Sequence, residues 1–192
     1  YLKCEKDDAN ICVYRSNQYN QQTSKYTDMS WTIKRKYLPK RIPFTAQQIY
    51  PYIFQLFNGW AWDKLYNRAF VERNELNFQE IRTTNDAYFV FMANVLADKI
   101  TIVDEVLAHH RINVKTSLSV TREVSWNCCW QATEAIKAEL QKKNIYNSVE
   151  QSFLNWSIHF LLWNVNTLQG TARDSLMDAI QMQYADNLHI QQ

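Results

Sequence analysis

NGWAWDKLYNR, residues 58–68, is the stretch around which the rest of this sequence is organised. It sets two tryptophans, an aspartate and a lysine beside one of the chain's two glycines. A second stretch, TNDAYF at residues 84–89, follows with an acidic residue where a helix is expected to begin. The remaining sequence is predicted to be a scaffold that holds these side chains in place.

The composition predicts a single helix-rich globular domain. A length of 192 residues with 46% hydrophobic residues suits one domain with a substantial core. Average usage would give roughly 13 glycines in this length, and the chain has two. So few turn residues favour helix, and no glycine-rich loop of the Walker or dinucleotide type is present. The predicted fold class is therefore α/β, or a helix-dominated α+β arrangement, with a small mixed sheet and a C-terminal helical bundle.

Charge and cysteine usage exclude several classes of protein. The 21 basic and 19 acidic residues nearly balance, which argues against a protein whose main task is to bind nucleic acid. No apolar run reaches the length of about 18 residues that a membrane span needs, and the first residues do not form a signal peptide. The four cysteines lack zinc-site spacing and are predicted to be reduced thiols of a cytoplasmic protein.

Hydrophobic periodicity predicts the order of the elements. Short β-branched runs at 10–14, 29–33, 100–103 and 106–112 are predicted to be strands. Thr45 and Gln48 are spaced as a capping box, Asp63 or Asn67 is expected to cap a helix, and Asn85 or Asp86 a longer one. From residue 117 onward the pattern is helical. The helix around 153–168 is apolar nearly all round, so we expect it to be buried between layers.

Three constellations could carry chemistry. Asp86 at a helix start is either a plain N-cap or an ionised general base. Trp60 and Trp62 are either core residues or a surface on which sugar rings stack, and in an extended segment Lys64 would point to the same side as Trp62.

The third constellation lies near the end of the strand predicted at residues 106–112. Arg111 and Ser117 are suited to bind phosphate, and one of the adjacent histidines, His109 or His110, could ligate a metal. The alternative is that these residues are simply an exposed strand end without a binding role. A basic cluster over residues 34–41 is either a solvated loop or a contact for an anion, meaning a phosphorylated substrate or a membrane surface.

The order and spacing of these residues resemble the C-terminal half of a bacterial family 2 glycosyltransferase of the GT-A fold. The resemblance runs over residues 1–122 and rests on the Trp-x-Lys-Leu-Tyr segment, the Asn85–Asp86 pair followed by x-x-Phe, and His110-Arg111 followed by Ser-Leu-Ser at 117–119. The family commonly has Glu before the conserved Asp and Tyr before the Arg, so residues 85 and 110 depart from it.

The resemblance implies a role for each candidate residue. Asp86 would be the general base of an inverting transfer of a sugar from a nucleotide-sugar donor. Trp62 and Lys64 would bind the acceptor. Arg111 and Ser117 would bind the donor diphosphate, and His110 would complete a metal shell. A divalent metal, Mg or Mn, is implied for the complete enzyme, and none is expected to be held tightly by this chain.

The resemblance also implies how the chain is divided and which part of the enzyme it lacks. Residues 1–122 would be the acceptor-side part of a GT-A domain, and residues 123–192 a helical extension packed on it. The nucleotide-binding half is not in this sequence, so we expect no sugar transfer by the chain alone.

The implied acceptor is a glycan or a lipid-linked intermediate of cell-surface polysaccharide synthesis, at the inner face of the membrane. Peripheral membrane contact and self-association through an exposed truncation face are further expectations. The alternative is a helical interaction module without catalysis that binds a protein partner or a membrane surface.

Overall fold

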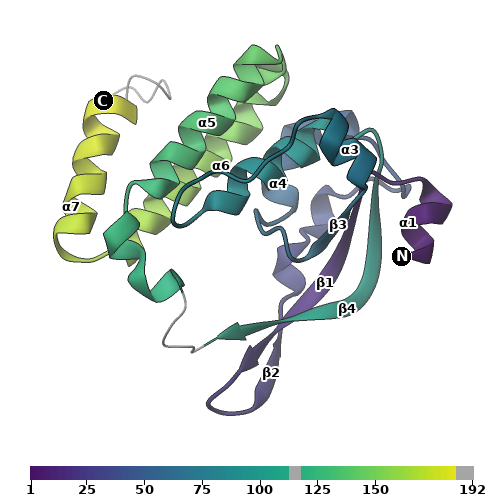
Figure 1. Cartoon of the computed structure of the whole chain (residues 1–192), viewed down its shortest axis with the longest axis horizontal. Helices are drawn as coiled ribbons and strands as arrows, with labels where there is room; N and C mark the ends of the chain where they lie inside the picture. The colour runs from purple at the N-terminus through teal and green to yellow at the C-terminus, as the bar shows by residue number, and fades with distance from the viewer. Residues whose placement is uncertain (113–117, 185–192) are drawn as a thin grey trace.

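The computed structural model describes residues 1–112 and 118–184, which combine a four-stranded mixed sheet with a larger helical body (Figure 1). The strands are β1 (Ile11–Asn20), β2 (Lys25–Asp28), β3 (Lys64–Tyr66) and β4 (Ile100–Ile112). The α-helices are α1 (Leu2–Asp7), α2 (Ile53–Leu56), α3 (Arg68–Arg73), α4 (Asn85–Leu96), α5 (Cys128–Lys142), α6 (Tyr146–Thr167) and α7 (Gly170–Ala179). Short 3-10 segments are η1 (Ser30–Thr32), η2 (Arg35–Tyr37), η3 (Ala46–Tyr52) and η4 (Leu118–Ser125), and a π-helical turn, η5 (Ile180–Tyr184), follows α7. The predicted helix-dominated α+β class is confirmed.

Strand β1 is the centre of the sheet. It pairs in parallel with β4 along its whole length, and on its other side it pairs antiparallel with β3 and then β2. The two strands predicted at 100–103 and 106–112 are one continuous strand, because the ladder with β1 absorbs irregularities on either side of Arg15. Only the first part of β4 is buried; toward its far end His109 is exposed, whereas His110 is half-buried.

The N-terminal predictions are confirmed except for one strand. The strand predicted at 10–14 is the start of β1, which forms an antiparallel hairpin with β2. Residues 29–33 are not a strand but contain the 3-10 turn η1, in which the Thr32 hydroxyl donates to the Met29 carbonyl at 2.9 Å. This local hydrogen bond satisfies a backbone carbonyl without a partner strand, which is how Ser and Thr side chains compete with a β ladder.

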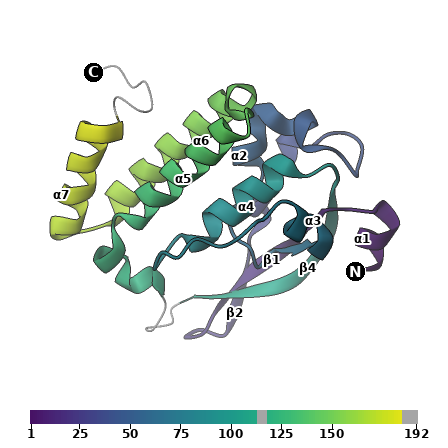
Figure 2. The ribbon, with the colours of Figure 1, turned by 45° about the horizontal axis from the view of Figure 1, so that its top comes forward.

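Helix α4 forms the middle layer, between the sheet on one side and α5 and α6 on the other (Figure 2). Its buried residues cover nearly every side of the helix: Ala87, Phe89, Val90, Phe91, Met92, Ala93, Asn94 and Val95. The prediction that the helix around 153–168 is the layer buried on all sides is wrong, because α6 exposes Leu162 by 52% and Trp163 by 48%. Helix α6 packs on α5 and α2 with one face, and its other face is outside the core.

The helix starts are set by side chains close to those predicted. Thr45 and Gln48 form the capping box, and the Asn67 side chain accepts from the Phe70 N–H at 3.0 Å at the start of α3. The N-cap of α4 is Thr84 rather than Asn85 or Asp86, so Asp86 lies inside the first turn. Within the described residues no helix has the length and apolar character to cross a membrane.

Candidate functional site

Lys64 fixes the shape of the tryptophan loop, residues 58–63, which carries Trp60 and Trp62. Its ammonium donates to the carbonyls of Asn58 at 2.9 Å and Trp60 at 2.8 Å, and to the Asp63 carboxylate at 2.5 Å. These three contacts use all three N–H groups of the ammonium. The sequence predicts an acceptor contact for Lys64, but the side chain is fully buried. The geometry therefore makes Lys64 a support for the loop and leaves it no surface for an acceptor.

Asp63 and Lys64 form an ion pair removed from water, with side chains 1% and 0% exposed. Burial raises the pKa of the Asp63 carboxyl, against the charge of Lys64, and burial lowers the pKa of the Lys64 ammonium. Asp63 does not cap α3, as one reading of the sequence proposed, because its carboxylate is held by Lys64. The pair lies between β1 and the loop, since the Tyr14 N–H donates to the Asp63 carbonyl at 3.1 Å.

Asp86 lies in the first turn of α4, next to this ion pair. Burial raises the pKa of its carboxyl, while its own backbone N–H, the charge of Lys64 and the N–H of Ala61 act in the opposite direction. Asp86 therefore lies close to Lys64 and to the backbone of Ala61, between the two tryptophans of the loop. A carboxyl with a raised pKa that is still supported in its ionised form is suited to accept a proton near neutral pH.

Tyr66 is a member of this cluster that the sequence reasoning missed. Its hydroxyl is buried without a hydrogen-bond partner among the described residues. Burial raises the pKa of Tyr66, and the charges of Asp63 and Asp86 raise it further. A buried hydroxyl that lacks a protein partner needs an explanation, and a bound water or ligand group is a usual one. Tyr66 is part of the Trp-x-Lys-Leu-Tyr segment, but nothing in that spacing shows which way its hydroxyl points.

The aromatic surface cluster consists of Trp31, Trp60, Trp62 and His110. The Trp60 and Trp62 rings stack with centroids 4.9 Å apart, and His110 stacks on Trp62 at 5.2 Å. Trp31 from η1 meets Trp60 edge-on at 5.7 Å and is 52% exposed. The sequence identified Trp60 and Trp62 but not Trp31. Trp31 lies in the run at 29–33 that the sequence predicts to be a strand, and nothing in that run indicates a contact with Trp60.

The predicted phosphate and metal contacts do not all meet at this cluster. His110 lies against the indoles with its Nδ1 buried and unpartnered among the described residues, and burial lowers the pKa of the imidazole. Arg111 follows it in β4, and successive strand residues point to opposite faces, so its guanidinium is directed away from the indoles. Ser117 lies outside the described residues.

The described residues contain no group of three or more His, Cys, Asp or Glu side chains that could hold a metal ion. Within residues 1–112 and 118–184, His110 therefore lacks the companion ligands that a metal shell requires. The implied roles of Arg111, Ser117 and His110 stay predictions.

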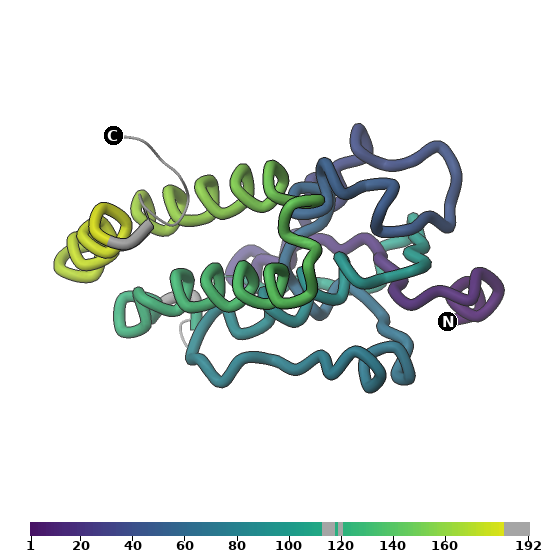
Figure 3. Tube along the Cα trace, turned by 90° about the horizontal axis from the view of Figure 1, so that it is seen from above, coloured from purple at the N-terminus to yellow at the C-terminus, as the bar shows by residue number. Residues whose placement is uncertain are grey.

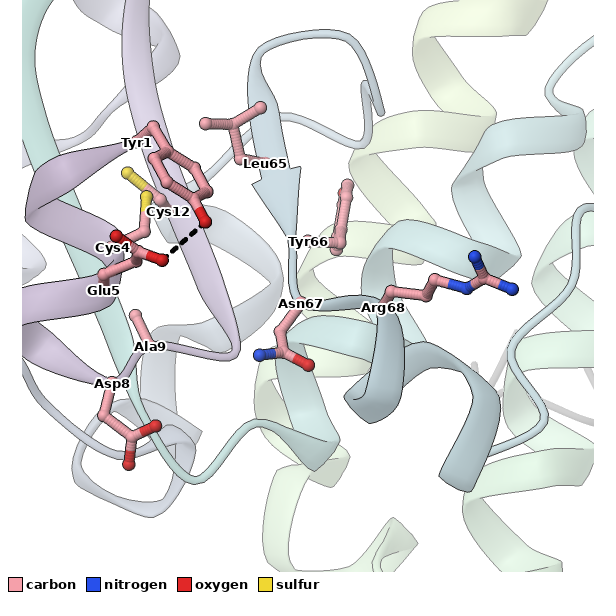
Figure 4. Close-up of a pocket in the computed structure, with 10 residues that line it drawn as sticks. All are labelled: Tyr1, Cys4, Glu5, Asp8, Ala9, Cys12, Leu65, Tyr66, Asn67 and Arg68. Carbon is pink, nitrogen blue, oxygen red and sulfur yellow. Dashed lines mark hydrogen bonds between the residues drawn. The ribbon is translucent and has the colours of Figure 1, made fainter.

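A cavity of about 620 Å³ lies between α1 and residues 65–68 (Figure 4). Its lining includes Glu5, the Cys4 and Cys12 thiols, Tyr66 and Arg68. None of the predicted site residues that the structure describes lines this cavity. The sequence predicts one sugar-sized hollow shared by Asp86, Trp62, Lys64 and Arg111, and this cavity is not that hollow.

Comparisons with known proteins give one coarse result. No family model matches the chain. Over 100 residues the chain is 29% identical to a protein of Bacillus subtilis (strain 168) named "Putative glycosyltransferase EpsH". The match covers 48% of this chain and 29% of that protein, so the chain spans well under half of its relative's length. The likeness relates the chain to glycosyltransferases at a coarse level and specifies neither a family nor a fold.

Proposed function

We propose that this chain is the acceptor-side and catalytic-base part of an inverting glycosyltransferase of the family 2, GT-A type. The observation that carries the proposal is the position of Asp86, whose carboxyl has a raised pKa and lies beside the buried Lys64 and the tryptophan loop. The likeness to a protein named as a glycosyltransferase supports the same reading. In this proposal residues 1–122 belong to the transferase domain and residues 123–192 extend it.

Asp86 acts as the general base in the proposed reaction. An acceptor hydroxyl gives its proton to the carboxylate, and the hydroxyl oxygen forms a bond to the anomeric carbon of the donor sugar. The bond from that carbon to the nucleotide diphosphate breaks, the leaving group takes the electron pair, and the configuration inverts. The raised pKa makes the carboxylate a stronger base, and Lys64 and the neighbouring N–H groups support its ionised form.

The aromatic surface cluster supplies the acceptor surface in this proposal. Indole faces bury the apolar side of a sugar ring while the ring hydroxyls stay available for hydrogen bonds. Trp62 is backed by His110 and Trp60, so its orientation is fixed before a ligand arrives. The exposed Trp31, edge-on to Trp60, extends this surface toward solvent. The acceptor is therefore a saccharide or a saccharide carried on a lipid, as the sequence predicted.

The test of the base is Asp86→Asn in a protein that joins this chain to a donor-binding half. We expect the rate of nucleotide diphosphate release to fall by roughly 10²–10⁴ with little change in the affinity for the acceptor. Asp98→Asn, which neutralises an exposed carboxyl at the other end of α4, is the matched control and should keep full activity. Equal rates for the two variants would contradict the proposal and favour an interaction module without catalysis.

The test of the acceptor surface needs neither donor nor turnover. Oligosaccharide binding to this chain is followed by tryptophan fluorescence, and we expect Trp31→Ala to weaken it by roughly 5- to 10-fold, the loss of one aromatic contact. Trp163→Ala is the control, because Trp163 is similarly exposed but lies on α6 under the Arg122 guanidinium. Equal binding by the two variants would remove Trp31 from the acceptor surface and leave the role of Asp86 untouched.

A further inference from the structure

The segment between the β1–β2 hairpin and the tryptophan loop carries positive charge and no negative charge. Between Asp28 and Asp63 the sequence has no acidic residue and five basic ones: Lys34, Arg35, Lys36, Lys40 and Arg41. Taking these five from the 21 basic residues of the chain leaves 16 against 19 acidic residues. The positive charge of this protein is thus concentrated in one loop, residues 34–42, on a body that is otherwise slightly acidic.

Within the described residues only one of the five cations, Arg35, forms an ion pair, so four keep an unneutralised charge. Arg35 pairs with Asp104, and the Lys36 ammonium lies over the Tyr37 ring at 4.7 Å from its centroid. Lys34, Lys40 and Arg41 are exposed and have no ion-pair partner in the described part of the chain. Their positive potential is therefore directed to solvent.

The basic loop is held as a fixed projection from the body. At its start Ile33 pairs with Phe57, and the Lys34 N–H donates to the Leu56 carbonyl at 3.0 Å. At its end Phe44 and Ile100 exchange two backbone hydrogen bonds, of 3.0 and 2.7 Å. Figure 3 shows this part of the chain, in blue, reaching outward at one end of the molecule. The anchored ends reduce the ordering that binding would otherwise require.

Apolar side chains lie among the cations of the basic loop. Ile42, next to Arg41, is 42% exposed, and Tyr52 is 46% exposed. The Tyr52 ring stacks on Tyr37 at 4.3 Å, so a layer of two phenols lies beneath the Lys36 ammonium. Phenol rings beside lysine and arginine are typical of protein surfaces at the boundary between lipid and water.

We propose that the basic loop, with Ile42 and Tyr52, binds the surface of an anionic lipid bilayer. The cations are spread along the loop rather than directed at one point, so they match a charged plane better than a single phosphate group. Juxtaposed cations and exposed apolar groups supply the two signals that stable peripheral binding requires. This inference goes beyond the proposed function and does not depend on Asp86. It would bring a lipid-carried acceptor to the same protein surface region as the loop.

The experiment measures co-sedimentation of the chain with vesicles of phosphatidylcholine, with and without phosphatidylglycerol. We expect binding only to the anionic vesicles, and weaker binding as salt rises. The triple variant Lys34→Gln/Lys40→Gln/Arg41→Gln should weaken it about 100-fold, from roughly fivefold for each cation near such a surface. Tyr52→Ala should weaken binding with the salt dependence unchanged, because it removes an apolar contact.

The matched control removes the same charge elsewhere. Lys25→Gln/Arg73→Gln/Arg173→Gln neutralises three exposed cations outside the loop and should bind nearly as the parent chain does. Circular dichroism shows whether each variant is folded. Equal losses in the two triple variants, absence of binding by the parent chain, equal binding to the two kinds of vesicle, or full competition by inorganic phosphate would each overturn the proposal.

Discussion

The protein has two clusters of aromatic rings that differ in what lies behind them. The aromatic surface cluster rests on a loop pinned by the buried Lys64 and lies next to Asp86. The aromatic core cluster lies between α2, α4 and α6 and consists of rings that contact one another: Phe54, Phe91, Phe153, Trp156 and Phe160. The core cluster has no ionisable group among its members, so it can only stabilise the fold. Titratable groups behind the surface cluster are what make it a candidate site.

The largest expected effect is the loss of the core cluster's central ring. Phe54 is 1% exposed, and its ring centroid lies 5.0 Å from Phe91 and 5.5 Å from Phe153. Phe54→Ala should lower the free energy of unfolding by about 3–5 kcal/mol, because a cavity replaces a packed ring. Urea denaturation measures the loss. Trp60→Ala, in the half-buried surface cluster, should cost clearly less, and an equal cost would end the distinction between the two clusters.

The next effect comes from the charges behind the surface cluster. Lys64→Met should lower the free energy of unfolding by about 3 kcal/mol, because Asp63 is left buried without its counter-charge. Adding Asp63→Leu to Lys64→Met should recover much of this loss, since an apolar pair can replace a buried ion pair.

Lys99→Met is the control for the lysine substitution. It breaks an ion pair with Asp8 in which both side chains are largely exposed, and such pairs contribute at most about 1 kcal/mol. If Lys64→Met cost no more than Lys99→Met, the tryptophan loop would not depend on the buried pair.

Local signals in the sequence predicted local structure. The capping box at Thr45, the cap at Asn67 and the strand predicted at 10–14 each depend on residues close together in the chain, and all three are confirmed. The continuous strand β4 could not be predicted, because its second half is held by a ladder with β1, some 90 residues earlier. That α4 rather than α6 is the central buried helix also depends on tertiary packing. The two helices have similarly apolar sequences, so the sequence alone does not show which of them is central.

The same limit applies to the site. The sequence predicts that Asp86, Trp62 and Lys64 share one hollow; the structure places Asp86 within electrostatic reach of Lys64, and the shared hollow stays a prediction. The burial of Lys64 was not predictable, because two of its partners are backbone carbonyls that any residue type supplies. Trp31 reaches Trp60 from a separate turn, and no spacing within one segment could show that contact.

The smallest expected effect separates a base from a simple helix cap at Asp86. Burial raises the pKa of this carboxyl above its ordinary 3.8, so the folded chain holds the proton more tightly than the unfolded chain does. The stability that this proton contributes is fully present below about pH 4 and is lost as the pH rises through the raised pKa. Asp86→Asn cannot ionise and escapes that loss, so its free energy of unfolding relative to the parent chain should rise with pH over this window.

Urea unfolding of both chains from about pH 4 to about pH 8 measures this difference. Carboxyls whose pKa is lowered, such as Asp7 beside Lys3, have the opposite pH dependence, but they are present in both chains and cancel. A carboxylate whose main task is to cap α4 would be stabilised in its ionised form by the helix dipole, and the relative stability of Asp86→Asn would then fall as the pH rises. The sign of one slope therefore decides whether burial or the helix start dominates the chemistry of Asp86.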